Sequence, residues 1–197
     1  MNPQDLSALV GSRICHDLIS PLGAIGNGIE LLTLTGVAQS PEMALISESI
    51  ENANARIRLF RVAFGSPGSG QSIGANEVAS ILKAISRGGR VQHSLSIEGD
   101  PDRAEVQCVF LAILCMEASM PAGGTISVTK DGDIWTLRSE TETLRQDGDL
   151  WNSLMDPESN YKVSSAQVQF ALLPRALTAL GRSMNISADD TGLSLTF

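Results

Sequence analysis

Two long amphipathic segments at the start of the chain constrain its fold more than any other feature. The first runs from about Asp5 to Leu34. The second begins at Ser40, where an N-cap residue, a proline in the first helical position and Glu42 in the first turn indicate a helix start. Its apolar residues recur in alternating steps of three and four, which is typical of the seam of a left-handed helical bundle. These seam residues are Met43, Ile46, Ile50, Ala53, Ile57, Phe60 and Phe64.

The short link from Thr35 to Gln39 predicts that the two helices are antiparallel neighbours. One such pair cannot enclose a core, because each seam residue would contact a partner on one side and water on the other. We therefore expect the pair to dimerise into a four-helix bundle about a two-fold axis. The alternative is that both seams dock onto the remainder of the same chain.

The composition changes after Phe64 to GSPGSGQSIG, and we predict a linker at residues 67–74. It separates a helical hairpin over residues 1–66 from a second unit over residues 75–197. Periodicity in that unit predicts helices at about 75–87, 101–120 and 165–180, and strands at about 91–97, 125–130, 134–139, 184–188 and 193–197. Helices mixed with mainly antiparallel strands indicate an α+β fold, here an α/β sandwich.

Composition and charge exclude several classes of protein. The net charge of −8 argues against a surface that binds nucleic-acid phosphates or anionic lipid, so we expect protein partners. No apolar run approaches the roughly 20 residues of a membrane-spanning helix, and the N-terminus shows no targeting signal, so we expect a cytoplasmic protein. The three cysteines lack CxxC spacing, which favours buried thiols over a disulfide framework or a zinc site.

His16 is the candidate reactive residue. With about 100° of rotation per residue, it points roughly 160° away from the centre of the apolar stripe of the first segment. The stripe comprises Ile14, Leu18, Leu22, Ile25, Ile29 and Leu32. A neutral imidazole that faces water is a nucleophile, and on a rigid helix it can accept a group from a partner. An isolated surface histidine without such a role is the plain alternative.

The residues around His16 resemble a known family. The string HDLISPLGAIGNGIELL is similar to the phosphoacceptor box of sensor histidine kinases, where the histidine is followed by an acid, a small polar residue and a proline. Here these are His16, Asp17, Ser20 and Pro21. The fuller string with GAIGNGIELL resembles one branch in particular, the ChpT-type histidine phosphotransferases of alphaproteobacteria. The resemblance implies that His16 accepts a phosphoryl group.

The second unit resembles the ATPase domain of a histidine kinase. The stretch MPAGGTISV is similar to the segment that follows the N-box helix in that domain. The C-terminal stretch LLPRALTALGRSMNISADDTGLSLTF is similar to its closing helix and strands.

Three nucleotide-binding parts of that domain are absent from the sequence. The N-box asparagine, which ligates magnesium, is missing from VFLAILCMEASM. No DxGxG adenine-binding loop occurs between Ser139 and Val163, and only Gly148 lies between Trp135 and Leu180, where a glycine-rich lid is expected. Phosphoryl transfer from ATP needs positioned phosphates and a metal, so we interpret the unit as a degenerate ATPase-like domain.

The resemblance therefore implies a phosphoryl carrier. We expect His16 to attack the aspartyl phosphate of a receiver domain and to surrender the group to the aspartate of another receiver. The acidic pocket of the receiver would supply magnesium, so no cofactor and no metal site is expected in this chain. The family resemblance implies a hybrid histidine kinase as donor and response regulators as acceptors.

Several residues are expected to support transfer. Ser20 lies one turn beyond His16, and Gly23, Ala24 and Asn27 continue the same face. Their small side chains would leave a flat strip for a partner helix. Such a strip would account for glycines at 23, 26 and 28, each of which weakens a helix by about 1 kcal/mol.

Charged residues near His16 are further candidates. Asp17 is expected to orient the imidazole or raise its basicity. Arg13 lies on the same side of the helix, and the antiparallel hairpin brings Arg56, Arg58 and Arg61 to about the same level. These arginines would meet an acidic partner or the phosphoryl oxygens, or they are simply solvated. The second histidine, His93, alternates with apolar residues of a strand and is predicted to lie at the edge of the core.

Three alternatives remain open beside the carrier. One is a true ATP-dependent kinase with a divergent pocket, and another is a non-catalytic dimeric scaffold that binds receiver domains. A third is a receiver phosphatase, because Ser20 holds the place of the polar group that positions water in phosphatase-active kinases. Nucleotide binding, phosphate on His16 and a Ser20→Ala variant would separate them.

Overall fold

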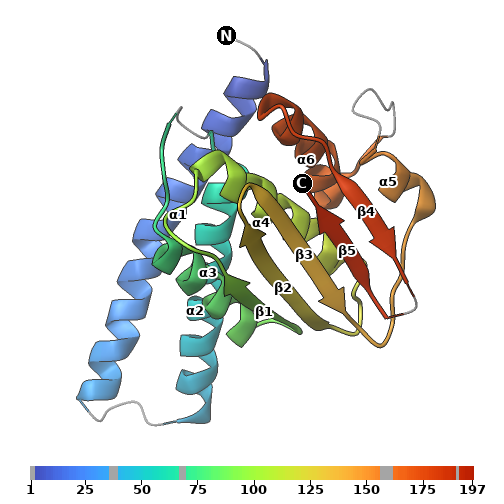
Figure 1. Ribbon diagram of the computed structural model, residues 1–197. Coiled ribbons are helices and arrows are strands. Elements are labelled where there is room, and N and C mark those ends of the chain that lie inside the picture. The colour runs from blue at the N-terminus through green and yellow to red at the C-terminus, as the bar shows by residue number, and fades with distance from the viewer. Residues whose placement is uncertain (1–2, 36–39, 67–69, 156–161, 190) are drawn as a thin grey trace.

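The hairpin predicted from the seam is the first feature of the computed structural model, which describes residues 3–35, 40–66, 70–155, 162–189 and 191–197 (Figure 1). Helix α1 (Pro3–Leu34) and helix α2 (Pro41–Ala63) pack side by side as an antiparallel pair. The hydroxyl of Ser40 accepts a hydrogen bond of 3.4 Å from the backbone N–H of Met43, which caps α2 at the predicted residue.

The remaining elements form a helix-covered sheet. In chain order they are α3 (Ala75–Arg87), β1 (Val91–Ser96), α4 (Arg103–Ala118), β2 (Gly124–Asp131), β3 (Ile134–Glu140), α5 (Gly148–Asn152), α6 (Val168–Ala179), β4 (Asn185–Ala188) and β5 (Leu193–Thr196). The five strands are ordered β1-β2-β3-β5-β4, with a parallel β1–β2 pair and antiparallel neighbours elsewhere. The prediction of an α+β fold is confirmed. Helix α5, which follows β3, was not predicted.

One face of the sheet is buried and the other faces solvent. Alternating residues of the two central strands point into the core, among them Ile126, Val128, Trp135 and Leu137, all with no exposed surface. Helices α3, α4 and α6 lie together on this buried face of the sheet (Figure 1). The second unit is thus a two-layer sandwich.

Helix α2 buries two opposite sides. Its seam lies towards α1, whereas Ala55, Leu59, Val62 and Ala63 are buried on the other side and belong to one hydrophobic core with α3 and α4. The sequence analysis missed this second side of α2. The hairpin docks onto the same chain through this second side of α2 and not, as the alternative above had it, through both seams, so that α2 lies between α1 and the sandwich (Figure 1).

The described part of the predicted linker is held against α4. Residues 67–69 lie outside the described residues. Beyond them, the backbone N–H of Ile73 donates to the carbonyl of Pro101 at 3.0 Å, and the N–H of Arg103 donates to the carbonyl of Gln71 at 2.8 Å. The side chain of Gln107 also donates to the carbonyls at the end of α2, at 3.1 Å to residue 63 and 2.8 Å to residue 65. These bonds attach α2 firmly to the sandwich.

The outer side of α1 carries an apolar stripe that no other described segment of the single chain covers. Ile14, Leu18, Ile25 and Leu32 are each between 44% and 54% exposed. Apolar area in contact with water is unfavourable by roughly 25 cal/mol per Å², so a stripe of this kind favours a partner. No helix among the described residues is both long enough and apolar enough to cross a membrane.

Candidate functional site

His16 projects from the open side of α1, with its side chain 81% exposed. The side of α1 that faces α2 is marked by Gly11, which lies against Phe64, and by Gly26, which lies against Ile50. By helical geometry, His16 is turned about 110° from the middle of that contact side. The imidazole is therefore free to meet an electrophile carried by another molecule.

Asp17 connects His16 to Arg13. Its Oδ1 lies 3.2 Å from Nδ1 of His16, and its Oδ2 accepts a hydrogen bond of 2.8 Å from Nε of Arg13. The hydrogen bond with His16 lowers the pKa of Asp17 below its ordinary value, and the Arg13 guanidinium lowers it further. An ionised carboxylate can only accept hydrogen bonds, so Nδ1 carries the proton in this contact. The lone pair of Nε2 is then left free.

The face of α1 beyond His16 is nearly flat. Ser20, Ala24 and Asn27 are exposed, and a Cβ atom added at Gly23 would meet nothing within 4 Å. Gly26 was expected to belong to this strip, but it faces α2 instead. A Cβ atom added there would lie 3.6 Å from a side-chain carbon of that helix. The strip of residues 20, 23, 24 and 27 therefore leaves room for a partner to approach closely.

A groove between α1 and α2 begins at Gly26, beside the last residue of the strip. Its volume is about 480 Å³. The lining residues are Gly26, Ile29, Glu30, Thr33, Leu34, Ser47, Ile50, Glu51 and Asn54. Leu34 is 76% exposed and lies two turns from Asn27 along the same helix. Strip and groove together offer one elongated surface that starts at His16.

The three candidate arginines of α2 differ in their partners. Nη1 of Arg56 lies 3.1 Å from a carboxylate oxygen of Glu117, and Nη2 of Arg61 lies 3.5 Å from one of Glu77. Arg58 forms no ion pair within the described part of the chain. Two of the three therefore bind the sandwich, and Arg58 keeps its charge available to a partner.

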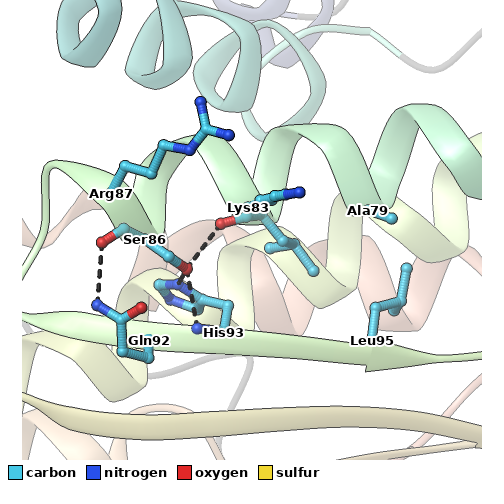
Figure 2. A pocket seen from close by; sticks show the side chains of 8 residues that line it. Ala79, Lys83, Ser86, Arg87, Gln92, His93 and Leu95 are labelled. Atoms are coloured by element: carbon cyan, nitrogen blue, oxygen red, sulfur yellow. Dashed lines mark hydrogen bonds between the residues drawn. The ribbon is translucent and has the colours of Figure 1, made fainter. Parts of the chain in front are cut away.

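The second histidine has a structural environment. The side chain of His93 is 1% exposed, and its Nδ1 lies 3.0 Å from Oγ of Ser86 (Figure 2). Its Nε2 lies 3.2 Å from a carboxylate oxygen of Glu117. Oγ of Ser86 also accepts the backbone N–H of His93 at 2.9 Å. A cavity of about 450 Å³ adjoins these residues, but the side chain of Arg87 extends away from the ring (Figure 2). The prediction that His93 belongs to the edge of the core is confirmed.

The sequence analysis missed two of these contacts. The Arg13–Asp17 pair had a visible signal, because residues four apart are neighbours on a helix. The contact between Arg56 and Glu117 had no signal in the sequence, because the two residues are 61 positions apart and meet only when α2 packs on α4.

The segment after β3 fills space beside α4 and α6 with its own side chains. Trp151 of α5 is 6% exposed, packs edge-to-face on Phe170 at 5.3 Å, and donates a hydrogen bond of 2.8 Å from Nε1 to Oγ of Ser119. Leu150 and Leu154 are also buried. This is the stretch where the sequence analysis sought an adenine-binding loop and found none. No cluster of three or more potential metal ligands exists among the described residues.

Comparisons with known proteins agree with this geometry. The sequence model of the family described as histidine phosphotransferase C-terminal domain matches residues 75–192. The chain is 38% identical over 196 residues to protein phosphotransferase ChpT of Brucella abortus (strain 2308), covering 94% of this chain and 92% of the relative. It also resembles a solved bacterial phosphotransferase with a TM-score of 0.73 and 26% identity, covering 100% of this chain and 97% of that one.

The matched residues account for the sandwich, and the alignment with the Brucella protein covers hairpin and sandwich together. Family, sequence relative and solved structure all indicate the same reaction, transfer of a phosphoryl group. The chain belongs to the ChpT-type histidine phosphotransferases.

Proposed function

We propose that His16 is the phosphoacceptor of this phosphotransferase, that it takes the phosphoryl group from the aspartyl phosphate of one receiver domain, and that it passes the group to the aspartate of another. One observation carries the assignment. The imidazole of His16 is exposed, and Asp17 occupies Nδ1, which leaves Nε2 as the nucleophilic atom. The other histidine is buried against Ser86 and Glu117.

The transfer step requires little of the protein beyond position and charge. The lone pair of Nε2 attacks phosphorus, the bond between phosphorus and the aspartyl oxygen breaks, and its electron pair stays on the carboxylate of the receiver. The Nδ1 proton of His16 remains in its contact with Asp17, where the carboxylate balances the positive charge that develops on the ring. The reverse sequence delivers the group to the second receiver.

The receiver is expected to bring the metal. A bound cation would neutralise negative charge on the phosphoryl oxygens during transfer, and the acidic pocket of a receiver suits magnesium. We propose a hybrid histidine kinase as donor and a response regulator as acceptor, with no cofactor resident in this chain.

The strip beyond His16 supports docking of a receiver helix. Gly23 leaves its position open, and Ala24 and Asn27 are small, so a helix lying there would bring its aspartate close to the imidazole. The groove that follows would receive further residues of the same helix. Arg58, which has no ion pair in the described structure, would meet the acidic rim of the receiver.

The uncovered stripe of α1 supports a homodimer. Ile14, Leu18, Ile25 and Leu32 repeat at a spacing that keeps one side of the helix apolar, and a second copy of the same stripe would cover it about a two-fold axis. The resulting four-helix bundle would leave both copies of His16 on outer faces.

Two further parts of the proposal have their own support. The packing of Trp151 against Phe170 and Ser119 supports a sandwich that does not use ATP, because those side chains fill the region after β3. A cytoplasmic location is supported by the three cysteines, which are free and buried, as is usual in a reducing compartment. Burial raises the pKa of the Cys108 thiol to about 12, which makes it unreactive.

The test is transfer of labelled phosphate to the full-length protein and to His16→Asn, supplied either with a phosphorylated receiver domain or with ATP and magnesium. We expect label on the wild type from the receiver alone, stable in base and labile in acid as for phosphohistidine, and none on the variant. His93→Gln is the matched control, because it removes the other imidazole and should still be labelled.

Each of the other outcomes would indicate a different function for this protein. Label from ATP alone would mean a divergent kinase. Label that survives in His16→Asn would move the acceptor elsewhere, and absence of label from both donors would favour a dimeric scaffold that only binds receivers.

A further inference from the structure

The carboxylate of Asp17 is held at both ends. Oδ1 faces Nδ1 of His16 at 3.2 Å, and Oδ2 accepts the Nε hydrogen of Arg13 at 2.8 Å. Arg13 is one helical turn before Asp17, so its side chain reaches the carboxylate from the N-terminal side. The result is a short chain of polar contacts that runs from Arg13 through Asp17 to the reactive ring.

Helical geometry explains why an anchor is needed. Residues next to each other in sequence point about 100° apart around a helix and do not naturally face one another. Asp17 must therefore turn its carboxylate back towards His16. By the same geometry Arg13 projects between these two side chains, one turn away, so a bond to Oδ2 favours the rotamer that presents Oδ1 to the ring.

The contacts among Arg13, Asp17 and His16 contribute little to the stability of the fold. The side chains of Arg13, Asp17 and His16 are 75%, 50% and 81% exposed. Exposed ion pairs of this kind contribute almost nothing measurable to stability, since water screens the charges and both side chains lose freedom. A fixed carboxylate beside a nucleophile, in contrast, affects where the proton of the imidazole resides.

We propose that Arg13 is a positioning residue for phosphoryl transfer: it anchors Asp17 so that Asp17 holds the proton on Nδ1 of His16 and keeps Nε2 free to attack. This inference rests on the proposed role of His16. It differs from the expectation that Arg13 binds the partner, because here Arg13 acts through Asp17 within its own helix.

A double-mutant cycle on full-length protein separates the two roles. Transfer from a phosphorylated receiver is timed for wild type, Arg13→Ala, Asp17→Asn and the double variant. We expect Arg13→Ala to slow transfer by roughly two- to fivefold, the range for one exposed charge pair. The double variant should be no slower than Asp17→Asn alone, because Arg13 has then lost the group through which it acts. Additive losses would overturn the proposal and assign Arg13 to the partner, and an unchanged rate in Arg13→Ala would overturn it outright.

Nitrogen NMR of the imidazole gives a second readout that needs no receiver. The chain has two histidines, so spectra of wild type and His16→Ala assign the ring of His16. We expect Nδ1 to be the protonated nitrogen in neutral wild-type rings, a smaller share of that tautomer in Arg13→Ala, and partial recovery in Arg13→Lys. An unchanged tautomer in Arg13→Ala would overturn the proposal even if transfer slowed.

The two readouts also separate this inference from the proposed function. If His16→Asn still accepted label, the acceptor assignment would fail while the NMR result continued to report on the contact. If His16 were the acceptor and the cycle were additive, only the role of Arg13 would fail.

Discussion

Glu105 shows how one residue organises charge inside the sandwich. It lies in the first turn of α4, accepts hydrogen bonds from Lys130 at 2.8 Å and from Trp135 at 3.1 Å, and also pairs with Arg182. Burial raises the pKa of Glu105, but these hydrogen bonds and the two positive charges outweigh burial and lower it below its ordinary value. The carboxylate thus joins α4, β2, β3 and the segment after α6.

Neutralising this carboxylate should weaken the fold. Glu105→Gln keeps the shape but removes the charge that satisfies Lys130 and Arg182, so we expect the free energy of unfolding to fall by about 2 kcal/mol. Urea denaturation followed by tryptophan fluorescence measures the change. The matched control is Glu98→Gln on the exposed loop after β1, which should have almost no effect. Equal effects of the two substitutions would contradict the prediction.

Acid should destabilise the protein through the same kind of group. Glu117 is also buried, which raises its pKa, but the facing His93 ring and Arg56 lower the value below the ordinary one, as happens at Glu105. A carboxyl group with a lowered folded pKa stabilises the fold fully above about pH 4.3, the unfolded value, and loses that contribution as the pH falls through the folded pKa. We therefore expect the free energy of unfolding to decrease below about pH 4.3. In a urea series across pH, Glu105→Gln should show a weaker decrease than wild type, and a steeper one would contradict the assignment.

The proposed function depends most on helix α1, because its three sides would have separate roles. One side meets α2, the side with His16 is polar or small, and the stripe with Ile25 is apolar and uncovered. Because three sides of one helix would have different roles, neighbouring residues in the sequence belong to different sides. Ala24, for example, lies on the strip and Ile25 on the apolar stripe.

A pair of substitutions at neighbouring positions separates these tasks. Ile25→Glu places a charge on the stripe, and because a two-fold axis would bring two such charges together, we expect the dimer to dissociate. Ala24→Glu lies about 100° away and should leave the dimer intact while slowing transfer by filling the strip. Light scattering after gel filtration gives the mass, and labelled transfer gives the rate. A monomeric wild type, or a dimeric Ile25→Glu, would refute the proposed interface.

The limits of sequence-based prediction are clearest for α2 and α5. The seam of α2 could be recognised in the sequence because its apolar residues repeat with the period of a helix. Leu59 and Val62 repeat with the same period on the opposite side, so periodicity alone did not show that this side is buried as well. Which side is buried depends on what packs there. Helix α5 has five residues, too few to show any period, and its place is fixed by the burial of Leu150 and Trp151 and by the contacts of Trp151 with Phe170 and Ser119.

At the scale of the whole molecule, hairpin and sandwich share one hydrophobic core. Leu59 of α2 has no exposed surface and lies among residues of α3 and α4. Gln107 and Arg103 of α4 donate hydrogen bonds to backbone carbonyls at the end of α2. Under the proposed function, a receiver that docked at His16 would therefore meet a surface whose two parts are held in a fixed relation.

A shared core predicts that both parts unfold together. Helical circular dichroism reports all helices, whereas fluorescence of Trp135 and Trp151 reports the sandwich, and at one protein concentration we expect the two denaturation curves to coincide. Leu59→Ala should shift both curves by the same amount, about 2–5 kcal/mol, because it opens a cavity in the common core. Leu45→Ala, on the exposed surface of α2, is the control and should shift neither curve appreciably. If fluorescence stayed unchanged while helicity fell in Leu59→Ala, the two parts would be independent domains.

Local sequence was sufficient to predict most helices and strands and the side of α1 on which His16 lies, because these follow from periodicity and residue type along a short stretch of chain. The long-range partners, in contrast, were settled by tertiary packing alone. Packing paired Arg56 with Glu117 rather than leaving it to another protein, and it placed Leu59 in a core shared with the sandwich. Such contacts join elements that are far apart in the chain. They form because packing buries apolar side chains and pairs charges at the same time, and no local sequence pattern shows which partners will meet.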